Sequence, residues 1–567
     1  MKLDIRSLLS AYRDGSTTPE KVITELKKKI AEAPASIWIS HTSDESLSRY
    51  LKNLHLKSPR DLPLYGIPFA IKDNIDLENC ETTAGCPAFA YTPNRSATVV
   101  GKLIRAGAIP LGKTNMDQFA TGLVGVRTPY GAIPNRFAPE YISGGSSSGS
   151  AAALAYGLCS FSLGTDTAGS GRVPAAFNNL YGVKPTCGLL STKGVVPACR
   201  SLDCVSLFAL NLSDAKRLLE IAEGYDEDDD YSRKAPENLA HLPENWTFGV
   251  PEESELNFFG NENYRKLFED SIAAAEKAGG KMRRIHFKPF LEAARLLYEG
   301  PWVFERYSAV GKFIEEHSAQ IHPVTRKIII PPSTPHPSHI FDAFHKLRHA
   351  KALADREMDQ VNFLMTPTVG TCYKTSEVEA DPIRLNSNLG YYTNYMNLLD
   401  FSALAIPVGF AGKLPFGVTL VGKAFAENVL FSAAEKLRSF LAPKMAIAVC
   451  GAHLQGMPLH GELEDAEFLG TQKTAAEYTM FALPGNIPKP ALVRAEKGGS
   501  SFYVELYALP AEEFGKFISQ IPAPLSIGKI RLENGSEVSG FLGEPIVQKI
   551  GKDISEFGDW RKYFLSL

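Results

Sequence analysis

Short apolar runs alternate with segments of helical periodicity between about residues 20 and 430 of the chain. Residues 18–33 open with Thr18–Pro19, a cap residue followed by Pro at the first helical position, and continue with apolar residues at helical spacing. Four short apolar runs, at 65–73, 106–114, 160–166 and 363–369, are flanked by Gly, Pro or polar residues, as is typical of buried strands. Strands that alternate with helices predict an α/β fold whose sheet is covered by helices on both faces.

The pattern changes near residue 444, where the apolar strand MAIAVCGAHL begins. Hairpin signals become frequent after this point, and Asn534–Gly535 between two alternating segments is a strong one. We therefore expect a first domain at residues 1–440 and a smaller α+β domain at residues 446–567. The second segment is long enough to fold independently.

The composition agrees with two globular domains and narrows the expected partners. A chain of 567 residues is too long for one hydrophobic core, and 44% hydrophobic with 22% charged residues is ordinary for globular proteins. The formal net charge of −3 gives no electrostatic reason to expect nucleic acid or an anionic membrane surface as a partner. We find no signal-peptide core and no apolar run long enough to cross a bilayer, and the eight cysteines form no CxxC pair. These features favour a soluble protein in a reducing cytoplasm.

A Gly/Ser segment at residues 143–150, SGGSSSGS, leads directly into the Ala-rich helix former AAALAYG. A flexible linker has the same composition. A linker, however, is not expected between strand signals and a buried helix. A Gly/Ser turn at a helix N-terminus leaves free N–H groups and gathers hydroxyls, including that of Ser146.

A second small-residue turn, DTAGSGRVPA, contains Ser170, 24 residues beyond Ser146. Successive N–H groups in such a turn can converge on an anion, as an oxyanion hole requires. Upstream, Lys72 ends an apolar run, which should desolvate its amine, lower its pKa and make it a proton acceptor. Each signal alone is weak, because most lysines are solvated and most Ser/Gly turns are only turns.

Taken in order, these segments closely resemble the amidase signature family. The matching segments are GIPFAIKDN (66–74), GGSSSGSAAALAYG (144–157), GTDTAGSGRVPAAF (164–177), LGKTNMDQFA (111–120) and YGVKPT (181–186). The resemblance covers about residues 20–430 and implies the fold of that family, a mixed central sheet covered by helices.

The resemblance also implies a role for each residue of the site. Ser170 would attack an amide carbonyl, Ser146 would relay the proton, and Lys72 would be the base behind it. The oxyanion would be held by the backbone N–H groups of four residues: Thr167, Ala168, Gly169 and Ser170. Asp166 and Arg172 match family positions that shape the site without taking part in the chemistry.

The segment YEGPWVFER, residues 298–306, bears on the choice of amide. Gly300–Pro301 should end one helix and start another, which can turn Tyr298 and Arg306 toward one pocket. The guanidinium fork suits a carboxylate, although a surface Arg and a core Tyr would fit the composition equally. The segment is similar to that of allophanate hydrolases, and this implies a small anionic substrate, urea-1-carboxylate. A general small-amide hydrolase of the same family is the main alternative.

The second domain supports the same assignment. Residues 449–493 resemble the C-terminal domain of allophanate hydrolases, which has a fold like that of γ-glutamylcyclotransferases. This implies decarboxylation of N-carboxycarbamate, the product of the amidase step. An acidic residue expected in a cyclotransferase is not evident after the strand–helix unit. His453, Tyr478 and Glu505 are candidates for a small anion pocket, and each could equally be a core residue.

Two other segments resemble sites of other classes. Residues 107–114, GAIPLGKT, fit the phosphate-loop pattern, but Pro110 lacks an N–H and the preceding segment has helical spacing, which favours a core strand. Four clustered histidines, His336, His339, His345 and His349, have no carboxylate between the last two, so solvated side chains are favoured over a metal site. We thus expect no cofactor. We also expect the protein to form a homodimer and a separate urea carboxylase to act in the same pathway.

Overall fold

The computed structural model describes residues 2–330, 336–441, 444–463, 466–485 and 488–567. The chain divides into two compact units, Met1–Leu441 and Ala442–Leu567. Each has a separate hydrophobic core. No helix among the described residues is long and apolar enough to span a membrane.

In the first unit, the described strands form one 11-stranded mixed sheet in the order β1-β3-β2-β4-β6-β5-β10-β11-β9-β7-β8. The strands are β1 (Trp38–His41), β2 (Pro68–Lys72), β3 (Ile109–Thr114), β4 (Phe161–Asp166), β5 (Tyr181–Lys184), β6 (Cys204–Ala209), β7 (Thr247–Pro251), β8 (Lys281–Ile285), β9 (Phe363–Pro367), β10 (Phe401–Ala411) and β11 (Leu414–Lys423). Strand β2 is parallel to β3 and β4, whereas β4 is antiparallel to β6. The predicted α/β class with a mixed sheet is confirmed.

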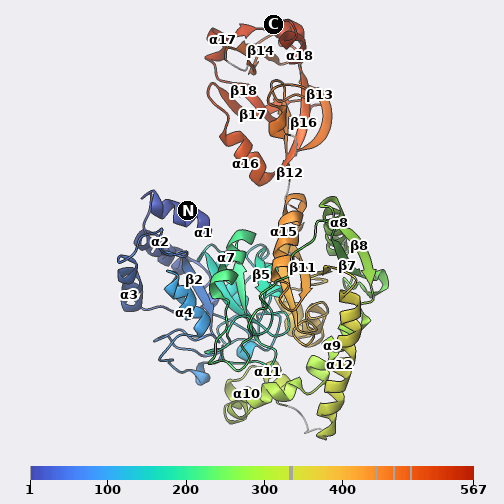
Figure 1. Ribbon diagram of the computed structural model, residues 1–567. Coiled ribbons are helices and arrows are strands. Elements are labelled where there is room, and N and C mark those ends of the chain that lie inside the picture. The colour runs from blue at the N-terminus through green and yellow to red at the C-terminus, as the bar shows by residue number, and fades with distance from the viewer. Residues whose placement is uncertain (1, 331–335, 442–443, 464–465, 486–487) are drawn as a thin grey trace. The chain divides into compact units, whose positions relative to one another are not determined.

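Helices surround this sheet (Figure 1). They are α1 (Ile5–Arg13), α2 (Pro19–Glu32), α3 (Asp44–Leu54), α4 (Thr98–Arg105), α5 (Ser148–Ala155), α6 (Val173–Phe177), α7 (Leu212–Ala222), α8 (Glu262–Lys277), α9 (Lys288–Glu299), α10 (Trp302–Glu316), α11 (Pro323–Ile329), α12 (Ser338–Met358), α13 (Thr375–Ala380), α14 (Arg384–Leu389) and α15 (Glu427–Leu441). Helix α2 begins as predicted, with Thr18 as its cap. Helices α9 and α12 lie side by side in Figure 1.

Helix α5 shows how small residues position the site. Its residues from Ser148 to Leu154 are all buried. A Cβ added to Gly149 would lie 2.5 Å from the carbonyl oxygen of Ile37 and 2.6 Å from the backbone nitrogen of Asn115. Since a larger residue would push the helix away, Gly149 lets the start of α5 lie directly against the strand ends.

The second unit contains an eight-stranded sheet in its described residues, in the order β13-β16-β12-β18-β15-β14-β19 with β17 paired to β18. Its elements are β12 (Lys444–Val449), β13 (Glu467–Lys473), β14 (Tyr478–Leu483), β15 (Lys489–Arg494), β16 (Tyr503–Pro510), α16 (Ala511–Ser519), β17 (Leu525–Arg531), β18 (Glu537–Gly543), α17 (Val547–Ile550), β19 (Lys552–Asp553) and α18 (Trp560–Phe564). Strands β17 and β18 form the predicted hairpin, with Gly535 at a φ of 84° in the turn.

Candidate active site

Lys72, the last residue of β2, lies at the centre of the site and is fully buried. Its Nζ donates hydrogen bonds of 2.7 Å to Ser146 Oγ and 2.7 Å to Thr165 Oγ1. Burial lowers the pKa of Lys72 to about 7, although the carboxylates of Asp117 and Asp203 act in the opposite direction. The amine is therefore able to exist in the neutral form at physiological pH, as a general base requires.

Ser146 precedes α5 and links Lys72 to the second serine. Its Oγ donates to Ser170 Oγ at 2.9 Å, so the three predicted residues form one continuous hydrogen-bonded chain. The Gly145–Ser146 peptide bond is cis. A Cβ on Gly145 would lie 2.2 Å from the Asp117 carboxylate, so only glycine fits beside that side chain.

Ser170 lies in a tight turn after β4 that is organised by Asp166. The Asp166 carboxylate accepts from the backbone N–H groups of Gly169 at 2.8 Å and Gly171 at 2.9 Å, and it pairs with Arg172 at 2.8 Å. Burial would raise the pKa of Asp166, but the Arg172 guanidinium holds it below its ordinary value. The predicted shaping role of both residues agrees with these contacts, since the turn is tied at two backbone positions.

The same contacts correct the predicted oxyanion hole at one position. The N–H of Gly169 donates to Asp166 and is not free to bind an oxyanion. No hydrogen bond among the described residues uses the N–H of Thr167, Ala168 or Ser170. These three groups remain as candidate donors, since an oxyanion needs unoccupied N–H groups aimed at it.

The break between α9 and α10 brings Tyr298 and Arg306 together. Helix α9 ends at Glu299 and α10 begins at Trp302, as Gly300–Pro301 predicted. The Arg306 guanidinium carbon lies 5.6 Å from the centre of the Tyr298 ring. Arg306 is 1% exposed, so the alternative of a surface arginine is wrong.

Arg306 is buried without a full set of partners. Its only described hydrogen bond runs from Nη1 to Thr121 Oγ1 at 3.4 Å, and its Nε has no acceptor. None of the described carboxylates forms an ion pair with it. A buried, unpaired guanidinium is costly, and an anionic ligand would offset that cost.

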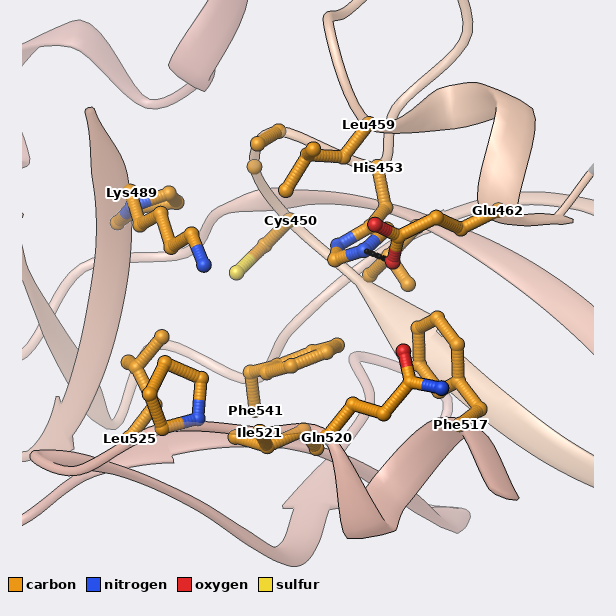
Figure 2. Close-up of a pocket in the computed structure, with 15 residues that line it drawn as sticks. Cys450, His453, Leu459, Glu462, Lys489, Phe517, Gln520, Ile521, Leu525 and Phe541 are labelled. Atoms are coloured by element: carbon orange, nitrogen blue, oxygen red, sulfur yellow. Dashed lines mark hydrogen bonds and ion pairs between the residues drawn. The ribbon is translucent and has the colours of Figure 1, made fainter. Parts of the chain in front are cut away.

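A separate cavity lies in the second unit (Figure 2). Its lining includes Cys450, His453, Glu462, Lys489 and Phe541. His453 Nε2 lies 2.9 Å from the Glu462 carboxylate, and the His453 ring stacks on Phe541 with centroids 5.5 Å apart. Figure 2 shows the Lys489 amine and the His453 ring both facing the cavity. This arrangement offers positive charge to a small anion.

The other two candidates of this unit, Tyr478 and Glu505, do not line that cavity. The Tyr478 hydroxyl accepts from the backbone N–H of Arg531 at 2.8 Å. Glu505 accepts from the backbone N–H of Gln455 at 2.8 Å and pairs with Arg561 at 3.1 Å. Both are buried residues with satisfied polar groups, which agrees with the alternative that they are core residues.

Comparison with protein families places these sites in context. Residues 21–431 match the Amidase family. The chain belongs to the amidase family. Residues 445–565 of this amidase match the Allophanate hydrolase C-terminal domain. The family resemblance seen in the sequence is confirmed for both segments.

Relatives of this amidase are similar over nearly the whole chain. Urea amidolyase of Lachancea kluyveri is 42% identical over 97% of this chain and 32% of that protein. Urea amidolyase of Saccharomyces cerevisiae is 41% identical over 93% of this chain and 31% of that protein. The chain thus spans about a third of the length of these curated relatives. The crystal structure of Kluyveromyces lactis allophanate hydrolase is 39% identical, with a TM-score of 0.74, and covers 99% of each chain.

The two competing sites take ordinary places in the amidase fold. Residues 109–114 of the phosphate-loop pattern form buried strand β3 after helix α4, as predicted, so their backbone is engaged in the sheet. All four clustered histidines are exposed, and the described residues contain no group of three His, Cys, Asp or Glu that could hold a metal ion.

Asp203 is a residue of the site that the sequence reasoning missed. Its carboxylate accepts from the Thr167 hydroxyl and from the backbone N–H of Ala198, the latter at 2.8 Å. Burial raises the pKa of Asp203 to about 6, while the bond from Thr167 lowers it. An aspartate just before an apolar strand was the only sequence signal, and it does not reveal a contact made across 36 residues.

Proposed function

We propose that this amidase hydrolyses allophanate to ammonia and N-carboxycarbamate. The observation that carries the proposal is the buried, unpaired guanidinium of Arg306 near the Ser170 turn. Ala168 of that turn packs in one apolar cluster with Trp302 and Tyr298 of the Arg306 segment. A carboxylate on a short amide would satisfy Arg306 while its carbonyl reaches Ser170.

The hydrogen-bonded chain supports a serine mechanism. Ser170 Oγ attacks the carbonyl carbon, its proton passes to Ser146, and the Ser146 proton passes to neutral Lys72. The tetrahedral oxyanion is held by free N–H groups of the turn. The relay then returns the proton to the leaving nitrogen, the C–N bond breaks, and ammonia departs.

Water completes the turnover. It attacks the acyl-enzyme as the same relay removes its proton, and the bond to Ser170 Oγ breaks. One amide bond and one water molecule thus yield ammonia and a carboxylate. On allophanate, the acyl product is N-carboxycarbamate, which bears carboxylates on both sides of its nitrogen.

We infer that the second unit promotes the decarboxylation of this product. In that step a C–N bond breaks, its electron pair stays on nitrogen, and nitrogen takes a proton as carbon dioxide leaves. The cavity at His453 supports this role, because Lys489 and a protonatable imidazole can meet two carboxylates. The remaining carbamate breaks down, so the net products are ammonia and carbon dioxide.

Substrate preference tests the proposal. Ammonia release is measured on allophanate, biuret, malonamate, glutaminamide and oleamide, and we expect the short anionic amides to be preferred. Arg306→Ala should reduce allophanate turnover by about 100-fold while changing hydrolysis of neutral malonamide far less. Broad activity on the panel would instead favour a general small-amide hydrolase.

The wider setting of the reaction follows from its chemistry. Allophanate is carboxylated urea, so an enzyme that carboxylates urea must supply it. A separate urea carboxylase, a homodimer and a cytoplasmic location stay predictions for this chain.

A further inference from the structure

A second buried guanidinium, that of Arg127, lies close to Arg306. Arg127 is 1% exposed. Its Nη1 donates to the carbonyl oxygen of Thr121 at 3.0 Å and its Nη2 to that of Pro382 at 2.7 Å, while its Nε has no acceptor. Only neutral carbonyl groups therefore receive hydrogen bonds from this cation among the described residues.

Thr121 joins the two arginines. Arg127 binds its carbonyl oxygen, and Arg306 binds its hydroxyl at 3.4 Å. Burial lowers the pKa of Arg127. Asp117 and Tyr298 act against this change, whereas the positive charge of Arg306 lowers the pKa further. The two cations are thus close enough to repel one another.

The carboxylate of Asp117, whose charge acts on Arg127, is already committed to the backbone. Asp117 accepts from the N–H groups of Val124 at 3.3 Å, Gly125 at 3.0 Å and Arg127 at 2.9 Å. It forms no ion pair with either guanidinium in the part of the chain that the structure describes. The turn is held by Asp117. Neither cation forms an ion pair among the described residues, although the charge of Asp117 acts on Arg127 and that of Asp203 acts on Arg306.

This arrangement is unfavourable unless an anion binds. Two like charges in a dry site repel, and each keeps an unsatisfied Nε. Arg172 shows the contrast, since its guanidinium pairs with Asp166 at 2.8 Å.

We propose that Arg127 is a second specificity-determining cation of the carboxylate pocket and selects, with Arg306, for an amide that bears a negative charge. The inference rests on the proposed function and deepens it. Arg306 and Tyr298 bind the substrate carboxylate, while Arg127 raises the local positive potential and holds Thr121 in place. Its loss would weaken the binding of anions and leave the Ser170 chemistry in place.

Inhibition of the full-length enzyme by matched ligands tests the inference. Malonamate, which is anionic, and malonamide, which is neutral, are compared as inhibitors or alternative substrates with the amide that the wild-type enzyme hydrolyses fastest. We expect Arg127→Met to weaken the binding of malonamate by about 10-fold or more and that of malonamide by about 2-fold at most. The variant should also raise KM for an anionic substrate more than it lowers kcat. Arg127→Lys should recover much of the preference because it keeps the charge.

Controls separate this role from a structural one. Arg284→Met removes a surface arginine paired with Glu253 and should leave the ratio of the two inhibition constants unchanged. Equal weakening of both ligands by Arg127→Met, or no weakening, would overturn the inference. If that variant does not fold, Arg127→Gln against Arg127→Lys gives the same comparison. A wild-type enzyme inactive on allophanate would overturn the proposed function, whereas an unchanged ratio overturns the inference about Arg127 alone.

Discussion

Lys72 Nζ lies 2.7 Å from Ser146 Oγ, and both side chains are fully buried. None of the described carboxylates forms an ion pair with this lysine. Dry surroundings favour the neutral amine, because burial outweighs the attraction of the carboxylates that act on Lys72 without pairing with it. The same contact places the amine beside Ser146, whose proton it can accept once the amine is neutral.

The nucleophile assignment predicts the effect of Ser170→Ala. Without Oγ there is no acyl-enzyme, so ammonia release from allophanate should fall by about 10⁴-fold or more. Because the only hydrogen bond of Ser170 Oγ among the described residues is the one from Ser146, the thermal midpoint of unfolding should change little. Ser160→Ala is a matched control, since its buried hydroxyl has no hydrogen-bond partner in the described part of the chain and plays no part in the relay. Substantial turnover by Ser170→Ala would refute the assignment.

The lowered pKa of Lys72 predicts the pH dependence of the reaction. Protonated Lys72 cannot accept the proton, so kcat/KM should be lost as pH falls through about 7 and should level off above it. The profile is measured by ammonia release. Lys72→Met should be inactive at every pH, and it should also stabilise the fold at neutral pH because it removes a costly buried amine. A flat profile of the wild-type enzyme across neutral pH would count against Lys72 as the base.

Asp203 should tune that profile. Its negative charge raises the pKa of Lys72, and it also accepts the hydroxyl bond of Thr167. Asp203→Asn keeps a hydrogen-bonding side chain but removes the charge, so the midpoint of the kcat/KM profile should move to lower pH. Asp359→Asn, at an exposed partner of Lys423, is the control and should leave the midpoint in place. An upward shift in Asp203→Asn would show that its charge does not act on Lys72.

Local patterns were sufficient to predict much of this arrangement. The apolar run before Lys72 predicted strand β2, and Gly300–Pro301 predicted the break that pairs Tyr298 with Arg306. Each depends on neighbouring residues alone. The order of the motifs then identified the family.

The remainder depends on contacts that no local pattern encodes. Arg127 meets Arg306 only because Thr121 lies between them, and the two arginines are 179 positions apart in the numbering. Gly169 was expected to bind an oxyanion, but its N–H faces Asp166 once the turn closes. Side chains on a strand alternate between the two faces of a sheet. The sequence alone therefore does not show that Tyr478 lies away from the cavity that His453 lines.

The cavity of the second unit gives the last prediction, which concerns the second reaction step. His453 lies beside the Glu462 carboxylate, and its ring stacks on Phe541. These two contacts orient the imidazole toward the cavity. Burial lowers the pKa of His453 while Glu462 raises it. His453→Ala should spare the first deamination, since the amidase residues all lie in the other unit. Carbon dioxide release should then lag behind ammonia, and only one of the two nitrogens of allophanate should appear as ammonia before slow spontaneous breakdown.

Two matched variants make this result specific. Glu462→Gln should slow carbon dioxide release less than His453→Ala, because the imidazole stays in the cavity but loses its charged partner. Tyr478→Phe removes a hydroxyl outside the cavity, so it should lower the unfolding midpoint through loss of the bond to Arg531 and leave the stoichiometry of ammonia unchanged. Rapid release of both nitrogens by His453→Ala would mean that this cavity does not take part in decarboxylation, because the second nitrogen is freed only after that step.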